Sequence, residues 1–233
     1  REVRRLLPDA DLVYLADQAN APYGERSIEE VRQFAESSVR TLVDLGASTV
    51  VVACNTASAA ALKHLRDAFS VPIVGMEPAV KPAAAATKTG KVAVLATPTT
   101  FQAAVFDELV GRFAAGITVI AHHCPGWAAA IEDDWPTGAK PAVAKHLAPL
   151  LEAGVDTIVL ACTHYSFIAD VISAVAGPTV TVVDPTTAVA RQVMRVADPR
   201  GGGSTIYLTT GNPERLATQV ARLLGDTVVP RRP

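Results

Sequence analysis

One stretch of the sequence occurs twice, and this repeat constrains the fold more than any other feature. Residues 42–58 read LVDLGASTVVVACNTAS, and residues 150–166 read LLEAGVDTIVLACTHYS. Each copy contains the end of a predicted helix, a glycine and an unbroken apolar run that ends in cysteine. A short apolar run between turn signals is typical of a parallel strand that is buried on both faces. The chain is therefore predicted to contain two similar α/β halves.

The two cysteines of the repeat, Cys54 and Cys162, occupy equivalent places in these halves. Each is predicted to lie at the carboxyl end of a buried strand, immediately before the next helix. Ligands of open α/β sheets bind at this edge. We therefore expect one site built from both halves, with a cysteine from each.

Strands and helices are predicted to alternate along the whole chain. Ser27 with Glu30 predicts a capping box at the start of one helix, and Pro98 is typical of the first turn of another helix, which is predicted to run to about Phe113. The fold class that follows is α/β, with two pseudosymmetric, open, mostly parallel sheets, helices on both faces of each sheet and the site in the crevice between them. We expect the first domain to comprise residues 1–85 plus 190–233, and the second domain to comprise residues 86–189.

Comparison of the two halves predicts one difference between them. In the second half, strands at 91–97 and 117–123 precede the Cys162 strand, whereas only one strand, at 10–17, precedes the Cys54 strand. The counterpart of strand 91–97 would have to lie before residue 1. The repeat therefore predicts that the first half has one strand fewer, as in a fragment.

Composition excludes several classes of protein. The chain has 233 residues and a formal net charge of −2, so it lacks the basic character of a nucleic-acid-binding domain. It contains no apolar run of the roughly 18 residues that cross a bilayer. Three widely spaced cysteines do not form a disulfide framework and favour a reducing cytoplasm. We expect neither a nucleic acid nor a membrane as a partner.

Two facing thiols suggest a particular chemistry. A helix N-terminus lowers the pKa of a thiol and binds carboxylates, and His164 is a candidate proton partner for Cys162. A carbon acid held between two thiols can lose its proton to one and gain a proton from the other on the opposite face, which inverts the stereocentre. No glycine-rich dinucleotide loop and no lysine in a Schiff-base setting is evident, so the sequence favours racemisation without a cofactor or a metal.

Two simpler interpretations stay open at this point. A buried cysteine often behaves as a small apolar side chain. Alternatively, the chain could bind zinc, because five residues are of the types that ligate it: His122, His123, Cys124, Cys162 and His164. A zinc site would leave Cys54 without a role. Glu132 is by default a surface carboxylate, and only a place in the crevice would make it an acid or base.

Four motifs in order, ADQANAPYG, VVVACNTAS, GMEPAVKPA and VLACTHYSF, resemble those of the glutamate racemases in the aspartate/glutamate racemase superfamily. The resemblance covers almost the whole chain. It implies cofactor-independent interconversion of L- and D-glutamate, which supplies D-glutamate to peptidoglycan. A homodimer is expected, although no residue pattern specifies it.

The resemblance also implies roles for individual residues. Cys54 resembles the thiolate that acts on the D-enantiomer, and Cys162 resembles the one that acts on the L-enantiomer. Glu132 and His164 resemble auxiliary acid/base residues on the Cys162 side. The positions that match substrate-binding residues are Tyr23, Gly24, Asn55, Thr56, Thr163 and His164.

The sequence departs from the family pattern at one important place. The family opens with a strand that ends in an Asp-Ser-Gly motif, and the strand expected before residue 1 is this element. This departure leaves one alternative open, an inactive fragment that keeps only a binding role, such as restraint of DNA gyrase. A second alternative is a racemase for aspartate or another amino acid, because specificity depends on the pocket for the substrate side chain.

Overall fold

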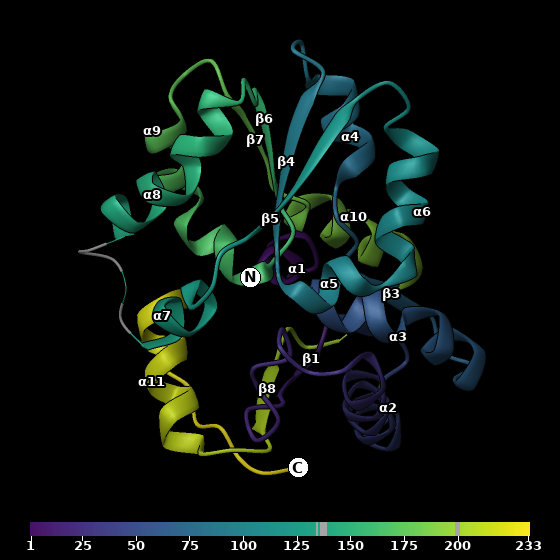
Figure 1. The fold of residues 1–233 in the computed structure, drawn as a ribbon. Coiled ribbons are helices and arrows are strands. Elements are labelled where there is room, and N and C mark those ends of the chain that lie inside the picture. Colours follow the sequence, from purple (N-terminus) through teal and green to yellow (C-terminus); the bar gives the residue numbers. More distant parts are fainter. Residues whose placement is uncertain (134, 136–138, 199–200) are drawn as a thin grey trace.

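The computed structural model describes residues 1–133, 135, 139–198 and 201–233, and within them parallel strands alternate with helices (Figure 1). The strands are β1 (Leu12–Ala16), β2 (Val50–Val52), β3 (Ile73–Gly75), β4 (Lys91–Ala96), β5 (Thr118–His123), β6 (Thr157–Leu160), β7 (Thr181–Val183) and β8 (Thr205–Thr209). The helices are α1 (Glu2–Leu6), α2 (Ile28–Asp44), α3 (Asn55–Ala68), α4 (Val80–Ala86), α5 (Pro98–Gln102), α6 (Ala104–Phe113), α7 (Trp127–Asp133), α8 (Ala139–Glu152), the 3₁₀ helix η1 (Thr163–Ile168), α9 (Ala169–Ala176), α10 (Thr186–Val196) and α11 (Pro213–Leu224). None of these described helices combines the length and the apolar composition needed to cross a bilayer.

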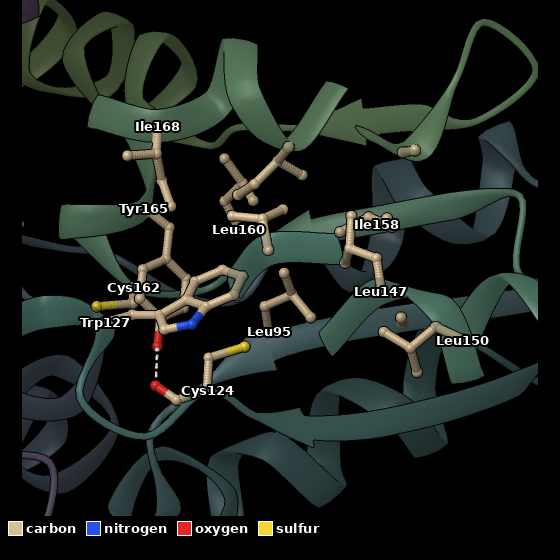
Figure 2. Packing of buried hydrophobic residues seen from close by; sticks show 14 of the residues in the cluster. Leu95, Cys124, Trp127, Leu147, Leu150, Ile158, Leu160, Cys162, Tyr165 and Ile168 are labelled. Atoms are coloured by element: carbon tan, nitrogen blue, oxygen red, sulfur yellow. Dashed lines mark hydrogen bonds between the residues drawn. The ribbon is translucent and has the colours of Figure 1, made fainter. Parts of the chain in front are cut away.

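The second half contains a parallel sheet with the strand order β5-β4-β6-β7. Side chains alternate between its two faces, because successive residues of a strand point in opposite directions. Leu95 and Leu160 lie in one core with α7, α8 and α9, shown in Figure 2. Val94 and Val159 lie in a second core with α4 and α6. Helices therefore cover both faces, which confirms the predicted α/β architecture for this half.

The first half is built from two parallel strand pairs, β1 with β8 and β2 with β3. In the second half, β4 pairs with both β5 and β6. Within the described ranges, no strand pairs with both β1 and β2 in this way. The repeat predicted this difference between the halves. Strand β8 comes from the C-terminal part of the chain, so residues far apart in sequence pair in this half.

One predicted helix is divided in two. The sequence predicted a single helix from Pro98 to about Phe113, but Ala103 is extended, with φ −76° and ψ 131°, and separates α5 from α6. The hydroxyl of Thr99 donates to the carbonyl oxygens of Gly24 and Arg26, each at 2.9 Å. These bonds fix α5 against a loop of the first half, while Phe106 of α6 is buried in the second half. The break lets each helix pack on its own partner.

Candidate active site

Cys54 lies where β2 ends and α3 begins. It is the N-cap of α3, and its sulfur accepts a hydrogen bond from the backbone N–H of Ala57 at 3.4 Å. Burial raises the pKa of the Cys54 thiol and outweighs the opposing effect of the Ala57 bond. A thiolate at Cys162 raises this pKa further. The expectation that the helix N-terminus lowers the pKa is therefore wrong as a net effect, because desolvation is larger.

Cys162 has nearly the same backbone conformation, with φ −143° and ψ 128° against −146° and 124° at Cys54. It is the N-cap of η1, a 3₁₀ helix, and its sulfur makes no cap bond. Instead, the sulfur lies 3.8 Å from Nδ1 of His164. A thiolate at Cys162 raises the pKa of Cys54, so the two sulfur atoms lie within electrostatic reach of each other.

His164 connects Cys162 to Glu132. Its Nε2 lies 2.8 Å from Oε1 of Glu132, which projects from α7. Burial lowers the pKa of His164, but hydrogen bonds to Cys162 and Glu132 outweigh it and raise the pKa to about 10. The bond from His164 lowers the pKa of Glu132. At neutral pH, an imidazolium therefore lies between the Cys162 sulfur and a carboxylate, and Glu132 is not a surface residue without a partner.

Asn55 and Thr56 follow Cys54 in the first turn of α3. Asn55 is 1% exposed, and neither its amide nitrogen nor its amide oxygen has a hydrogen-bond partner among the described residues. A buried amide without partners is costly, so its donor and acceptor are available to a bound ligand. Thr56 is also buried, and its hydroxyl lies 2.9 Å from that of Thr97. Thr163, the matching residue of the second half, is half-buried next to Cys162.

Tyr23 and Gly24 lie in the loop that follows β1. The Tyr23 hydroxyl donates to Oδ2 of Asp17 at 2.5 Å. Burial, followed by this bond, raises the pKa of Tyr23, so the phenol stays neutral. At Gly24, a Cβ atom would lie 2.7 Å from Cγ2 of Thr97, a distance that only glycine permits without movement of the threonine. This loop therefore contacts the second half closely.

Several polar residues near these side chains were not singled out from the sequence. Thr97 and Thr100 form a hydroxyl cluster with Thr56. Both follow β4 and therefore lie at the same sheet edge as Cys162, so their position in the sequence could have indicated that they belong to the site. No sequence pattern predicts that Gln219 belongs to the site. It lies on α11 and donates to Oε2 of Glu132 at 3.2 Å, a contact that depends on long-range packing.

A cavity of about 370 Å³ lies beside β3 and α10, away from both cysteines. Its lining residues are Arg66, Phe69, Ser70, Val71, Pro72, Ile73, Val74, Gln192 and Val196. None of them is a predicted site residue. The candidate active site is therefore defined by its side chains, which carry the relevant chemistry, and not by this cavity.

Known proteins resemble the chain over most of its length. Residues 1–193 match the family described as Asp/Glu/Hydantoin racemase. The glutamate racemase of Roseiflexus sp. (strain RS-1) is 46% identical over 96% of this chain and 86% of its own length. The solved glutamate racemase of Thermus thermophilus, in complex with β-chloro-D-alanine, is 34% identical and has a TM-score of 0.82, covering 99% of this chain and 89% of its own.

The glutamate racemase of Escherichia coli, solved with L-glutamate and the activator UDP-MurNAc-ala, superposes with a TM-score of 0.88. It is 29% identical, and the match covers 99% of this chain and 91% of the Escherichia coli chain. Sequence and structure therefore agree with the resemblance drawn from the four motifs. The chain belongs to the Asp/Glu/Hydantoin racemase family.

Proposed function

We propose that the protein is a glutamate racemase that interconverts L- and D-glutamate with two cysteine thiols and no cofactor. The observation that carries the proposal is the pairing of Cys54 and Cys162 at equivalent strand ends, within electrostatic reach of each other. The relatives at this level of identity are glutamate racemases, which supports glutamate as the substrate. The product D-glutamate would supply peptidoglycan synthesis.

In the proposed reaction, one thiolate removes the α-proton and becomes a thiol. The opposite thiol then donates its proton to the other face of the α-carbon and becomes a thiolate. Cys162 removes the proton of L-glutamate, and Cys54 removes that of D-glutamate. Each turnover leaves the two cysteines in the protonation states that the opposite enantiomer needs, so proton balance is kept.

The carbanion requires stabilisation, because an amino acid loses its α-proton reluctantly. Preorganised donors at the substrate carboxylate supply this in a site from which water is excluded. We assign this role to the amide of Asn55, which is unpartnered among the described residues, with Thr56 and Thr163 beside the two thiols. Tyr23 and Gly24 complete the proposed substrate-binding set from the loop after β1.

His164 and Glu132 act on the Cys162 side in this proposal. An imidazolium 3.8 Å from the Cys162 sulfur stabilises its thiolate, and Glu132 in turn stabilises the imidazolium. His164 also lies next to Thr163, so it contributes to the substrate-binding set. This arrangement gives Cys162 a charged partner that Cys54 does not have among the described contacts.

The wider organisation follows from the same proposal. We infer that residues 1–85 plus 190–233 form one domain and residues 86–189 the other, with the substrate in the crevice between them. Three free cysteines favour a cytoplasmic location. A homodimer is our expectation for the assembly, which sedimentation equilibrium would test.

The reaction can be tested by α-proton exchange in deuterated water, followed by proton NMR for L- and D-glutamate separately. The wild-type chain is expected to exchange the α-proton of both enantiomers and to racemise them. Cys54→Ala and Cys162→Ala are expected to abolish racemisation, with any residual exchange limited to L-glutamate for Cys54→Ala and to D-glutamate for Cys162→Ala.

Full racemisation by either cysteine variant would refute the two-thiol mechanism. L- and D-aspartate serve as the parallel substrates, because an aspartate racemase is the alternative within this chemistry. Faster exchange of aspartate than of glutamate would overturn the assignment of the substrate while keeping the mechanism. Circular dichroism of both variants controls for loss of the fold.

A further inference from the structure

A second cluster of reactive side chains takes no part in the proposed racemisation. His122 lies in β5, Cys124 follows that strand, and His146 projects from α8. One ligand atom from each of these residues lies within 4.8 Å of the other two. Nε2 of His122 and Nδ1 of His146 are 3.0 Å apart. The three residues therefore converge although His146 is distant in sequence.

The structure places four of the five candidate zinc ligands in two separate groups, and His123 belongs to neither. Cys162 and His164 lie together with Glu132, and His164 uses both ring nitrogens for these neighbours. His122 and Cys124 instead lie with His146, which no sequence pattern indicates as a ligand. Only the second place offers three ligand atoms that face one another, among the residues that the structure describes.

The separations in this cluster are close to those of a metal site. In a tetrahedral zinc site with bonds of about 2.0–2.3 Å, the ligand atoms lie about 3.3–3.6 Å apart. The two imidazole nitrogens are 3.0 Å apart, and the thiol is no further than 4.8 Å from either. A bound ion therefore requires the imidazoles to separate slightly and the sulfur to approach by about 1 Å.

The surroundings hold the ring of His146 and the backbone of Cys124 in place. The ring of His146 packs edge-on against Trp127, with centroids 5.3 Å apart, and the Tyr165 hydroxyl donates to the Cys124 carbonyl at 3.3 Å. Figure 2 shows Trp127, Tyr165 and Cys124 packed together in the buried core. Cys124 is 2% exposed, whereas both histidines are half-buried. The open side of the cluster is therefore the histidine side, from which an ion and a water ligand can enter.

We propose that His122, Cys124 and His146 bind a Zn²⁺ ion, with water as the fourth ligand. One thiolate and two neutral imidazoles form a ligand set suited to zinc, and binding releases the thiol proton of Cys124 to solvent. Cys124 precedes α7 and His146 lies beyond it, so the ion ties together the two chain segments that flank the helix carrying Glu132. The proposed site does not depend on the proposed racemisation.

The test uses Co²⁺ as a spectroscopic substitute for Zn²⁺, on protein without a histidine tag. The chain has three cysteines, so Cys54→Ser with Cys162→Ser leaves Cys124 as the only thiol. We expect this double variant to bind one Co²⁺ with a thiolate-to-cobalt charge-transfer band that Zn²⁺ abolishes by displacement. His146→Gln in the same background is expected to weaken binding by at least about 10-fold.

The matched control is His123→Gln, a neighbouring histidine of the same strand that is not part of the cluster, and it is expected to leave the affinity unchanged. Zn²⁺ is also expected to raise the melting temperature of the double variant but not that of its His146→Gln derivative. Absence of the charge-transfer band in the double variant would overturn the proposal, because Cys124, its only thiol, would then not coordinate the metal. Equal affinity with and without His146 would overturn it as well.

Discussion

His164 is the residue whose charge state most affects the chemistry of the site. An ordinary histidine is mostly neutral at pH 7, but this one has Cys162 and Glu132 as hydrogen-bond partners. These bonds outweigh burial and raise its pKa to about 10. A group whose pKa is raised on folding stabilises the folded state below its unfolded pKa. This contribution is then lost as the pH rises from about 6.5 to about 10.

Replacement of Glu132 by glutamine tests this arrangement, because it removes the charge and keeps the size of the side chain. The pKa of His164 is expected to fall from about 10 toward its ordinary value, and racemisation is expected to fall about 10²-fold, as for loss of a positioned acid/base group. The pKa is measured by NMR titration of the imidazole, and racemisation by circular dichroism. A wild-type His164 that titrates near pH 6.5 would contradict the ion-pair interpretation.

The residues of the site differ in how far the sequence could predict them. Cys54, Asn55, Thr56, Cys162, Thr163 and His164 follow buried strands directly, so their shared sheet edge could be inferred from the repeat alone. Glu132 could be suggested only by resemblance, since its contact with His164 joins residues of separate elements. Gln219 could not be predicted, because nothing near it in sequence indicates that α11 reaches α7.

At the scale of single elements, local signals placed α2 well. Ser27 accepts a hydrogen bond from the Glu30 N–H at 3.2 Å, and the Glu30 side chain accepts from the Ser27 N–H at 3.0 Å. This is the capping box that the sequence predicted. The division between α5 and α6 was not predicted, because the contacts that hold α5 come from Gly24 and Arg26, which are distant in sequence. Local patterns therefore predict helix starts better than they predict interruptions imposed by tertiary contacts.

The cap also contributes to the stability of the fold. It fixes the start of α2 directly after the loop that carries Tyr23 and Gly24. Ser27→Ala removes the side-chain acceptor and is expected to lower the free energy of unfolding by about 1 kcal/mol. Ser37→Ala is the matched control, since Ser37 is an exposed interior residue of the same helix. Urea unfolding measures both variants, and equal stabilities would show that the cap contributes nothing.

At the scale of the whole molecule, the C-terminal helix α11 connects the two halves (Figure 1). It follows β8, which pairs with β1 of the first half, yet Arg222 of α11 donates to the carbonyl oxygens of Ile131 (at 2.7 Å) and Glu132. Gln219 donates to the Glu132 side chain at 3.2 Å and accepts from Gln18 at 2.6 Å. A chain of hydrogen bonds therefore runs from the loop after β1 to the proposed acid/base pair of the second half.

Replacing Gln219 by leucine breaks this chain while keeping the volume of the side chain. A hydrogen bond to a charged group contributes about 1.5–3 kcal/mol, so kcat/KM for racemisation is expected to fall about 10-fold or more. Because L- and D-glutamate have equal free energies in water, the decrease must be the same in both directions for any variant that still racemises. Gln33→Leu, at an exposed position of α2, is the matched control and is expected to keep wild-type kcat/KM.

The pH profile distinguishes positioning from simple stability in this variant. Gln219 donates to the Glu132 carboxylate and lowers its pKa, so its loss is expected to raise the pKa of Glu132. A purely structural role would lower the melting temperature and leave the titration of the Glu132 carboxyl group unchanged. Unchanged kcat/KM in Gln219→Leu would mean that the two halves hold the acid/base pair without the bridge from α11.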